Sequence, residues 1–359
     1  MDVREFDFDL PTDLIAQEPA VQRIDARLLR LDRSTGSITH TTVAALPGLL
    51  QPGDVVVVNN TRVFPARLLG RRVPSGGAVE CLLIARLGTE QGRSGDGAVS
   101  AGLWEALVHP GQKLKPGARA VFEGVRTLHA EILERRFFGR RLIRLWTGDG
   151  SSVDEAIDAI GHVPLPPYIK RGDTADDRDR YQTVFARSRG SVAAPTAGLH
   201  FTGPLLEALA ARGVTVAEIT LHVGYGTFQP VRVDRVEDHR LEPERYEIDD
   251  RAASLINRAL DEDRRVIAVG TTTTRTLEAV AHEHEGRVAP GEGATDLFIY
   301  PGFEFRVVRG LLTNFHLPRS SLLMLVAAFA GLERVRDAYA AAIAAKYRFY
   351  SYGDAMLIT

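Results

Sequence analysis

Three histidines are the residues of this sequence best suited to acid–base chemistry: His200, His222 and His316. Each is predicted to lie in a loop beside small or amide-bearing side chains, where a catalytic base would be placed. Histidine titrates near neutral pH, so it can take up a proton and return it during a reaction. A loop histidine can instead simply hydrogen-bond the backbone, and that alternative stays open for each of the three. We predict that at least one of them is catalytic.

His200 lies in a segment of small residues, Gly190–Thr202, whose only polar groups are Ser191, Thr196, His200 and Thr202. Its glycines and its proline make it a poor helix and a poor strand, so it should be a tightly held loop. Thr202 is typical of a helix N-cap, followed by a helix with a buried leucine stripe. A small-residue loop that ends at a helix N-terminus lets a ligand reach the backbone and its unpaired N–H groups. The alternative is a turn that only packs closely.

Similar polar loops recur, each following a segment that has the pattern of a buried strand. The run Asp54–Asn59 leads into Asn60, and the run Arg265–Val269 leads into Gly270. Open α/β sheets bind ligands at the carboxyl ends of their strands, which favours a site formed by these loops. Turn capping is the commoner role of asparagines in this position and remains the alternative for Asn60.

The elements needed to position these loops alternate between helices and strands in the second half of the chain. We expect strands at Val214–Leu221, Arg265–Val269 and Thr295–Tyr300, and amphipathic or buried helices at Arg251–Asp263 and Leu322–Phe329. Such alternation predicts an α/β main domain with a mixed sheet covered by helices.

Between these parts the pattern changes to short apolar runs separated by Gly, Pro and polar turns, which predicts a small inserted antiparallel β-barrel. We therefore predict an α/β catalytic domain over residues 1–60 plus 151–359 and an inserted domain over residues 61–150. Residues 61–150 contain 15 Lys and Arg against 8 Asp and Glu, a net charge of +7, which leaves −9 for the rest of a chain whose total is −2. A basic module on an acidic body is typical of polyanion binding, and a solvated surface is the alternative.

Composition narrows the class of protein. The 359 residues are 45% hydrophobic and 25% charged, as in an ordinary globular protein, and the length suggests two domains. We expect no signal peptide and no membrane span, and the single Cys81 rules out an internal disulfide and suits the cytoplasm. The sequence has no GxGxxG opening a helix, no P-loop and no metal-binding motif, and His282 and His284 should be stray surface histidines.

Seven segments along the chain are distinctive enough to compare with known families: Asn59–Arg67, Arg180–Phe185, Gly190–Thr202, His222–Val231, Gly270–Glu278, Thr313–Pro318 with Ser320 and Ser321, and Tyr347–Met356. They resemble the family of S-adenosylmethionine:tRNA ribosyltransferase-isomerases of queuosine biosynthesis. The resemblance runs nearly end to end, and several segments are long enough to be specific. The poor matches are the helix end near His282 and the glycine-rich stretch Leu87–Gly102, which we predict to be a flexible hairpin tip and a lineage-specific extension.

The resemblance implies an unusual reaction. The family transfers the ribosyl part of S-adenosylmethionine to the aminomethyl group of 7-aminomethyl-7-deazaguanine in a tRNA anticodon, and rearranges it to give epoxyqueuosine. Adenine and methionine leave, so S-adenosylmethionine is consumed as a ribosyl donor, and no recycled cofactor or metal is expected. The expected partners are this tRNA and S-adenosylmethionine, with no membrane, and we predict a cytoplasmic monomer.

The implied chemistry assigns roles to the polar residues. A base beside the sulfonium can start the reaction by removing an acidic C5′ hydrogen, which suits one of the three histidines. Arg275 and Glu278, one helical turn apart, suit a methionine carboxylate or ammonium, and an i,i+3 salt bridge is the alternative. The tyrosine-rich tail suits base stacking or the sulfonium, and an aromatic lid on the core is the alternative. The expected substrate-binding residues are Asn60, Arg62, Ser191, Thr196, Gly198, Tyr225, Thr271, Thr272, Arg275, Glu278, Asn314, Ser320, Arg348, Tyr352 and Asp354, and the expected tRNA contacts are Arg135, Arg136, Arg140 and Arg141.

Two other functions compete with this one. An S-adenosylmethionine-dependent RNA methyltransferase would use similar substrates, but it normally has a glycine-rich nucleotide loop after its first strand, and Asp54–Asn60 has none. A non-catalytic RNA-binding protein built around the basic insert would leave the small-residue loops of the acidic domain unexplained.

Overall fold

The computed structural model of the chain describes residues 1–94, 97–228 and 231–359. Gln229 and Pro230 of the segment His222–Val231 therefore lie outside the described residues, as do two residues of the predicted hairpin tip. The chain divides into two units. Unit 1 comprises Met1–Arg62, Pro166–Arg171 and Arg180–Thr359, and unit 2 comprises Val63–Leu165 and Gly172–Asp179. Unit 2 reaches further along the chain than the predicted 61–150 insert, because helix α2 (Val153–Ile160) packs on its strands.

Unit 1 contains a nine-stranded mixed sheet. Its four central strands are parallel to one another: β12 (Thr215–Leu221), β3 (Val55–Asn59), β14 (Val266–Val269) and β16 (Val308–Asn314). On one side of them the sheet continues with antiparallel strands β13 (Glu244–Ile248) and β15 (Gly291–Thr295). On the other side it continues with β17 (Ala355–Ile358), β1 (Arg27–Leu31) and β2 (Ile38–Thr42). The predicted α/β class with a mixed sheet is confirmed.

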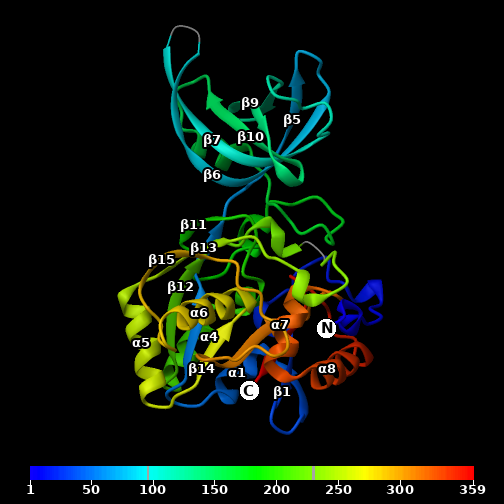
Figure 1. Cartoon of the computed structure of the whole chain (residues 1–359), viewed down its shortest axis with the longest axis vertical. Coiled ribbons are helices and arrows are strands. Elements are labelled where there is room, and N and C mark those ends of the chain that lie inside the picture. Colours follow the sequence, from blue (N-terminus) through cyan, green and yellow to red (C-terminus); the bar gives the residue numbers. More distant parts are fainter. Residues whose placement is uncertain (95–96, 229–230) are drawn as a thin grey trace. The chain divides into compact units, whose positions relative to one another are not determined.

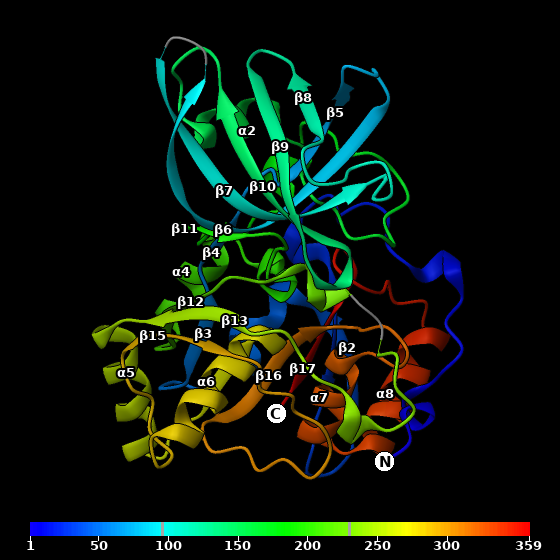
Figure 2. The same ribbon diagram turned by 45° about the horizontal axis from the view of Figure 1, so that its top comes forward.

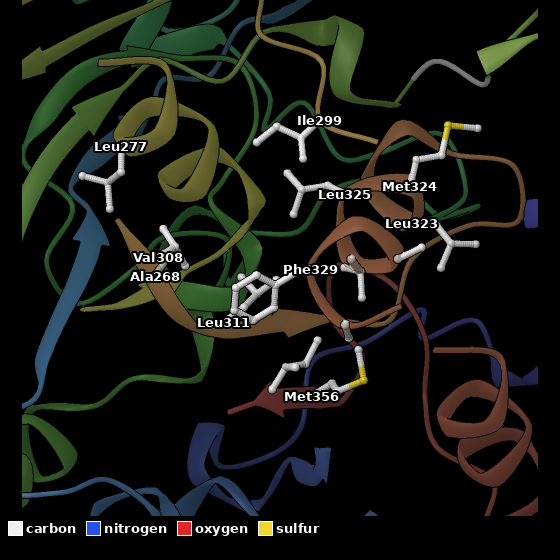
Figure 3. Close-up of a cluster of buried hydrophobic side chains, with 14 of the residues drawn as sticks. Ala268, Leu277, Ile299, Val308, Leu311, Leu323, Met324, Leu325, Phe329 and Met356 are labelled. Atoms are coloured by element: carbon white, nitrogen blue, oxygen red, sulfur yellow. The ribbon is translucent and has the colours of Figure 1, made fainter. Parts of the chain in front are cut away.

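Helices cover both faces of the sheet. This burial on both faces explains why Val55–Val58 of strand β3 is an unbroken apolar run. Val55 and Val57 pack in the core cluster that includes α5 (Asp250–Asp261), α6 (Thr271–Glu283), α7 (Ser321–Ala330) and α8 (Leu332–Ala344) (Figure 1). Val56 and Val58 pack in a second cluster with α1 (Leu46–Leu49) and α4 (Gly203–Ala211). Successive side chains of a strand point to opposite faces, so a strand buried on both faces must be apolar at every position. Figure 3 shows part of the first cluster, in which side chains of β14, β16 and α7 face one another.

The predicted N-cap of helix α4 is confirmed. The Thr202 hydroxyl accepts a hydrogen bond from the Leu205 N–H at 3.3 Å at the start of α4. Ser320 caps α7 in the same way, through the Leu323 N–H at 3.2 Å. One strand prediction is wrong: β15 covers Gly291–Thr295, and residues 296–300 have no regular structure. The apolar run does not form a strand because Phe298 and Tyr300 contact each other, with tilted rings, and pack onto the core instead of pairing in a sheet.

Unit 2 is built around a closed barrel of six strands, in the order β10-β7-β6-β5-β8-β9 (Figure 2). Every pairing is antiparallel, which confirms the predicted barrel. Burial in β10 alternates residue by residue, as expected for a strand with one face inside a barrel. The strands are β5 (Arg67–Val73), β6 (Ala78–Ser94), β7 (Gly97–His109), β8 (Arg119–Glu123), β9 (Thr127–Arg135) and β10 (Arg140–Thr147).

Within the predicted hairpin tip Leu87–Gly102, the described residues Leu87–Ser94 and Gly97–Gly102 belong to strands β6 and β7. The pairing of β6 with β7 continues to Ser94 and Gly97, beyond register shifts near Leu83 and Arg86. Backbone hydrogen bonds between strands do not depend on side-chain type, so a glycine-rich sequence can still extend a ladder. The remaining elements are β4 (Thr61–Val63), β11 (Ser188–Ser191), α3 (Asp177–Arg180) and 3-10 helices η1 (Val3–Phe6), η2 (Thr12–Leu14), η3 (Arg23–Asp25), η4 (Val43–Ala45), η5 (Phe137–Gly139), η6 (Thr196–His200), η7 (Tyr225–Phe228) and η8 (Val236–Asp238). Among the described residues, no helix has the length and apolar character to cross a bilayer.

Candidate active site

The polar loops predicted from the sequence meet at one edge of the unit 1 sheet. Because β12, β3, β14 and β16 are parallel, their carboxyl ends lie along the same edge. His222 follows β12, Asn60 follows β3, Gly270 follows β14, and Asn314 is the last residue of β16. The carboxyl edge of a parallel sheet is where α/β proteins bind ligands. We therefore take this edge as the candidate active site.

The small-residue segment Gly190–Thr202 lies along this edge and contacts the ends of three strands. After β12, the Ser191 hydroxyl accepts a hydrogen bond from the Val223 N–H at 2.8 Å. After β14, a Cβ placed on Gly270 would be 3.7 Å from the Cβ of Ala197. At the end of β16, Asn314 contacts His200. The segment is thus the tightly held loop that its composition predicts.

His222 is held in one orientation on this edge. Its Nδ1 is 2.8 Å from the Thr61 hydroxyl, and that hydroxyl donates to the Ser188 carbonyl at 3.4 Å. The arrangement that satisfies both groups has the Nδ1–H donating to Thr61, which leaves Nε2 as a proton acceptor. Gly190 packs flat on the ring, since a Cβ there would be 2.7 to 2.9 Å from three ring atoms. Burial, together with the charge of Arg245, lowers the pKa of His222.

His200 is more deeply buried, with 5% of its surface exposed. Its Nε2 is 3.3 Å from the Asn314 side-chain nitrogen, which also donates to the Tyr350 carbonyl at 3.1 Å. Burial, and then the positive charges of Arg348 and Arg23, lower the pKa of His200 to about 4. The ring is therefore neutral at pH 7, with a nitrogen that accepts rather than donates.

His200 also lines a small cavity of about 20 Å³ within unit 1. Of the predicted site residues, His200 and Tyr352 reach this cavity. The two arginines in its wall were not predicted: Arg180 begins one of the segments that carry the family resemblance, whereas nothing local distinguishes Arg23. The residues lining the cavity are Pro19, Ala20, Arg23, Ala26, Arg180, Leu199, His200, Ser351, Tyr352 and Gly353.

His316 has the contacts of a structural histidine. Its Nε2 is 2.7 Å from the Thr313 hydroxyl, and its backbone N–H donates to the Tyr339 hydroxyl at 2.9 Å. Burial lowers the pKa of His316 to about 3. These contacts favour the alternative that this histidine serves only the fold, and leave His200 and His222 as the candidates for catalysis.

The start of α6 presents polar groups at the same edge. The hydroxyls of Thr273, Thr274 and Thr276 donate to backbone carbonyls four residues earlier in the chain. The structure gives Thr271 and Thr272 no such bond within the described part of the chain, and Gly270 provides no side-chain cap for the helix. The first N–H groups of this 13-residue helix, with their partial positive charge, therefore accompany two hydroxyls at the site.

Arg275 and Glu278 are the main corrections to the predicted site. Arg275 forms a buried ion pair with Glu244 of β13, and both side chains are 8% exposed. Glu278 is fully buried and accepts the backbone N–H groups of residues 306, 307 and 308 at 2.8 to 3.0 Å. Neither the predicted contact with methionine nor the alternative i,i+3 salt bridge fits these partners. Side chains on one helix can reach strands that sequence spacing does not reveal.

Several other predicted residues brace the site rather than line it. Asp354 is 1% exposed and accepts the N–H groups of Arg27 and Arg348. Ser320 caps α7, and Ser191 is fully buried beneath the loop. A Cβ on Gly198 would be 2.8 Å from the Thr183 side chain, so glycine is needed there for close packing. The Asn60 side chain forms hydrogen bonds with Thr220 and Glu218. Arg62 is exposed on β4. Thr196 in η6 and Tyr225 in η7 are half-buried.

In unit 2, the four arginines predicted to contact tRNA differ in their surroundings. Arg135 is exposed, and Arg136 and Arg140 both pair with Glu105. Arg141 is 6% exposed and donates to four backbone carbonyls, those of residues 111, 114, 139 and 140. A buried guanidinium with these partners cannot reach a nucleic acid, so Arg141 is removed from the predicted tRNA contacts.

Within residues 1–94, 97–228 and 231–359, no group of three or more His, Cys, Asp or Glu could hold a metal ion.

The mixed sheet with its polar carboxyl edge defines a protein of the α/β class with a candidate ligand-binding site in unit 1. The chain belongs to the queuosine biosynthesis protein family, whose model matches residues 3–358. This confirms the family expected from the sequence motifs.

Full-length relatives agree with this assignment. The S-adenosylmethionine:tRNA ribosyltransferase-isomerase of Heliobacterium modesticaldum is 50% identical over 359 residues, which cover all of both chains. The protein of the same name from Geobacter sulfurreducens is 50% identical over 99% of each chain. The crystal structure of the S-adenosylmethionine tRNA ribosyltransferase of Thermotoga maritima aligns with 99% of this chain at a TM-score of 0.54 and 38% identity.

Proposed function

We propose that this chain is an S-adenosylmethionine:tRNA ribosyltransferase-isomerase. It transfers the ribosyl group of S-adenosylmethionine to the aminomethyl nitrogen of 7-aminomethyl-7-deazaguanine at the wobble position, and isomerises it to give epoxyqueuosine. Adenine and methionine are released. The observation that carries the proposal is the end-to-end match with relatives that bear this name, at 50% identity over complete chains.

In this reaction, His222 serves as the base that removes the C5′ proton next to the sulfonium. Two features support the assignment: its Nδ1 is engaged by Thr61, and its lowered pKa keeps the ring unprotonated at pH 7. Nε2 is therefore ready to accept a proton. His200, whose lower pKa of about 4 makes it a weaker base, is the second candidate.

The loop Gly190–Thr202 and the start of α6 hold the substrate. The loop exposes backbone rather than bulky side chains, which lets a ligand approach closely. The hydroxyls of Thr271 and Thr272 and the N–H groups of the helix start are suited to oxygens of the ribose and to negative charge. Unit 2 contributes tRNA backbone contacts through Arg135, Arg136 and Arg140.

The substrates account for the other parts of the proposal. S-adenosylmethionine is consumed, so no recycled cofactor takes part. The enzyme acts as a monomer. It works in the cytoplasm, which agrees with a chain whose single cysteine, Cys81, is buried and forms no disulfide.

Product analysis tests the proposal. Incubation with S-adenosylmethionine and tRNA bearing 7-aminomethyl-7-deazaguanine should release adenine and methionine in equal amounts. Ribose label should enter the tRNA, whereas methyl label should leave with methionine. The same tRNA with guanine at the wobble position is the control and should be inert, because guanine lacks the nucleophilic amine. Methyl label in the RNA, or S-adenosylhomocysteine as the main product, would instead identify a methyltransferase.

A further inference from the structure

Two loops of unit 2 are tied together at one end of the barrel. The first, residues 110–118, connects β7 to β8, and the second, residues 136–139, connects β9 to β10. The buried guanidinium of Arg141 donates to two backbone carbonyls of the first loop and to one of the second, at 2.9 to 3.3 Å. Because one side chain holds both loops, the residues that they expose form a single surface.

The second loop exposes an aromatic ring on this surface. Phe137 is 88% exposed, although phenylalanine is among the residues most often buried. A single exposed apolar residue is common in proteins and carries no argument by itself. The argument for a binding role comes from the side chains around it.

Three exposed cations accompany the ring. Lys113 and Lys115 belong to the first loop, and Arg135 is the last residue of β9. Arg135 lies opposite Arg141 in the β9–β10 ladder, so the two side chains project from the same face of the sheet. Burial, and then the charge of Arg135, lower the pKa of Arg141. We call the surface formed by Lys113, Lys115, Arg135 and Phe137 the barrel-end surface.

The carboxylates of the neighbouring strands pair with other arginines. Glu105 pairs with Arg136 at 3.6 Å and with Arg140 at 2.8 Å. Glu134 lies 3.7 Å from Arg136. Within the part of the chain that the structure describes, the three cations of the barrel-end surface form no ion pair. Their charge is therefore available to an anionic partner.

Exposed cations around an aromatic face are suited to single-stranded nucleic acid. The cations attract phosphates, and the ring stacks on a base, whichever base it is. A base inside an RNA duplex is already stacked between its neighbours, so only an unpaired nucleotide offers its face to a protein ring. An anionic membrane would attract the same cations, but binding to its interface needs a broader apolar face than the ring of Phe137 provides.

We propose that the barrel-end surface binds an unpaired nucleotide of the substrate tRNA, whose base stacks on Phe137 while the neighbouring phosphates contact the three cations. The inference rests on the proposed function, since it takes the substrate to be tRNA. The nucleotide is not the one that is modified, which reacts in unit 1. Stacking thus adds a contact that does not depend on charge to the arginine contacts of the barrel.

Salt-dependent binding tests the proposal. The probe is fluorescently labelled full-length tRNA carrying 7-aminomethyl-7-deazaguanine, titrated by anisotropy over a series of KCl concentrations. Phe137→Ala should weaken binding by about 5- to 150-fold, the effect of losing one base–aromatic stack, and leave the slope of log K against log salt unchanged. Lys113→Gln and Lys115→Gln should each reduce the steepness of that slope by about 0.7, the value for one phosphate contact on a single strand.

Two controls match these variants. Val125→Ala removes an apolar side chain that is 86% exposed in the β8–β9 turn, at the other end of the barrel. Arg251→Gln removes an exposed cation of α5 in unit 1. Neither should change the affinity or the slope. All of these side chains are exposed, so each variant should melt at the temperature of the wild type.

Two further variants distinguish stacking from apolar contact. Phe137→Trp keeps an aromatic face and should bind tRNA about as tightly as the wild type. Its added indole emission, taken as the difference from a wild type that already contains Trp104 and Trp146, should be quenched by tRNA. Phe137→Leu keeps an apolar side chain without an aromatic face and should bind as weakly as Phe137→Ala. A short RNA duplex should bind the wild type and Phe137→Ala equally, because its bases are already stacked.

Several results would overturn the proposal. They are an unchanged tRNA affinity in Phe137→Ala, wild-type affinity in Phe137→Leu, or an equal loss of affinity for the duplex. Vesicles of phosphatidylserine and phosphatidylcholine that bind the wild type but not Phe137→Ala, with tRNA affinity unchanged, would reassign the surface to a membrane. Failure of the proposed function is distinct from these results. A wild type that shows the predicted pattern of tRNA binding but releases no adenine would contradict that function and leave the stacking contact standing.

Discussion

The buried ion pair between Arg275 and Glu244 should be a main support of the site in unit 1. Arg275 lies in the first turns of α6, and Glu244 begins β13. The other carboxylate oxygen of Glu244 accepts the Gly224 N–H at 2.8 Å, two residues after His222. Burial lowers the pKa of Arg275 to about 10, so its guanidinium is still charged at pH 7. The pair therefore connects α6 to the loop that carries His222.

Arg275→Met removes the cation and leaves a buried carboxylate whose one other partner among the described residues is the Gly224 N–H. Breaking a buried pair in this way costs about 3–5 kcal/mol, because the remaining charge is uncompensated. At roughly 2–4 °C per kcal/mol for a domain of this size, the melting temperature should fall by about 6–20 °C. The double variant Arg275→Met/Glu244→Gln removes both charges and keeps an acceptor for Gly224, so it should recover most of that loss.

Thermal melts at pH 7, followed by circular dichroism, measure both variants against the wild type. Arg309→Met, which breaks an exposed pair with Asp263, is the control and should shift the melting temperature by less than about 3 °C, since surface pairs contribute at most about 1 kcal/mol. Adenine release should fall in Arg275→Met and return in the double variant, because the loop position depends on Glu244. A shift in Arg275→Met no larger than that of the control, or a double variant less stable than either single variant, would refute this reasoning.

Three other predictions address the chemistry and the RNA contact. His200→Ala and His222→Ala should fold normally, and at least one should lose turnover by a factor on the order of a hundred; full activity in both would place the base elsewhere. If His222 is the base, its lowered pKa puts the acid limb of the kcat/KM profile below pH 6.5, and Arg245→Gln should move that limb to higher pH by removing a repelling charge. Replacing Arg135 and Arg136 with Gln should weaken tRNA binding and flatten its salt dependence without changing the affinity for S-adenosylmethionine; an unchanged slope would mark a merely solvated surface.

The sequence by itself determined the architecture of this protein. The unbroken valines of Val55–Asn59 predict a strand buried on both faces, and the short runs after Arg67 predict the barrel, because side-chain burial follows the period of each element. The N-caps at Thr202 and Ser320 are local as well, since a cap needs only its own turn of helix. The loops of the site were recognised for the same reason: small residues, prolines and amides constrain the backbone where they stand.

Only the tertiary structure decided which polar side chains are available to a substrate. Arg275, Glu278 and Arg141 look like binding residues in the sequence, yet each is buried with partners that lie 1 to 31 residues away in the chain. Arg23 and Arg180 are the opposite case, because neither was predicted as a site residue. Both line the same cavity, although they lie 157 positions apart in the chain. A charged side chain is neutralised or left available by what folds against it, and those long-range contacts leave no periodic or local signal in the sequence.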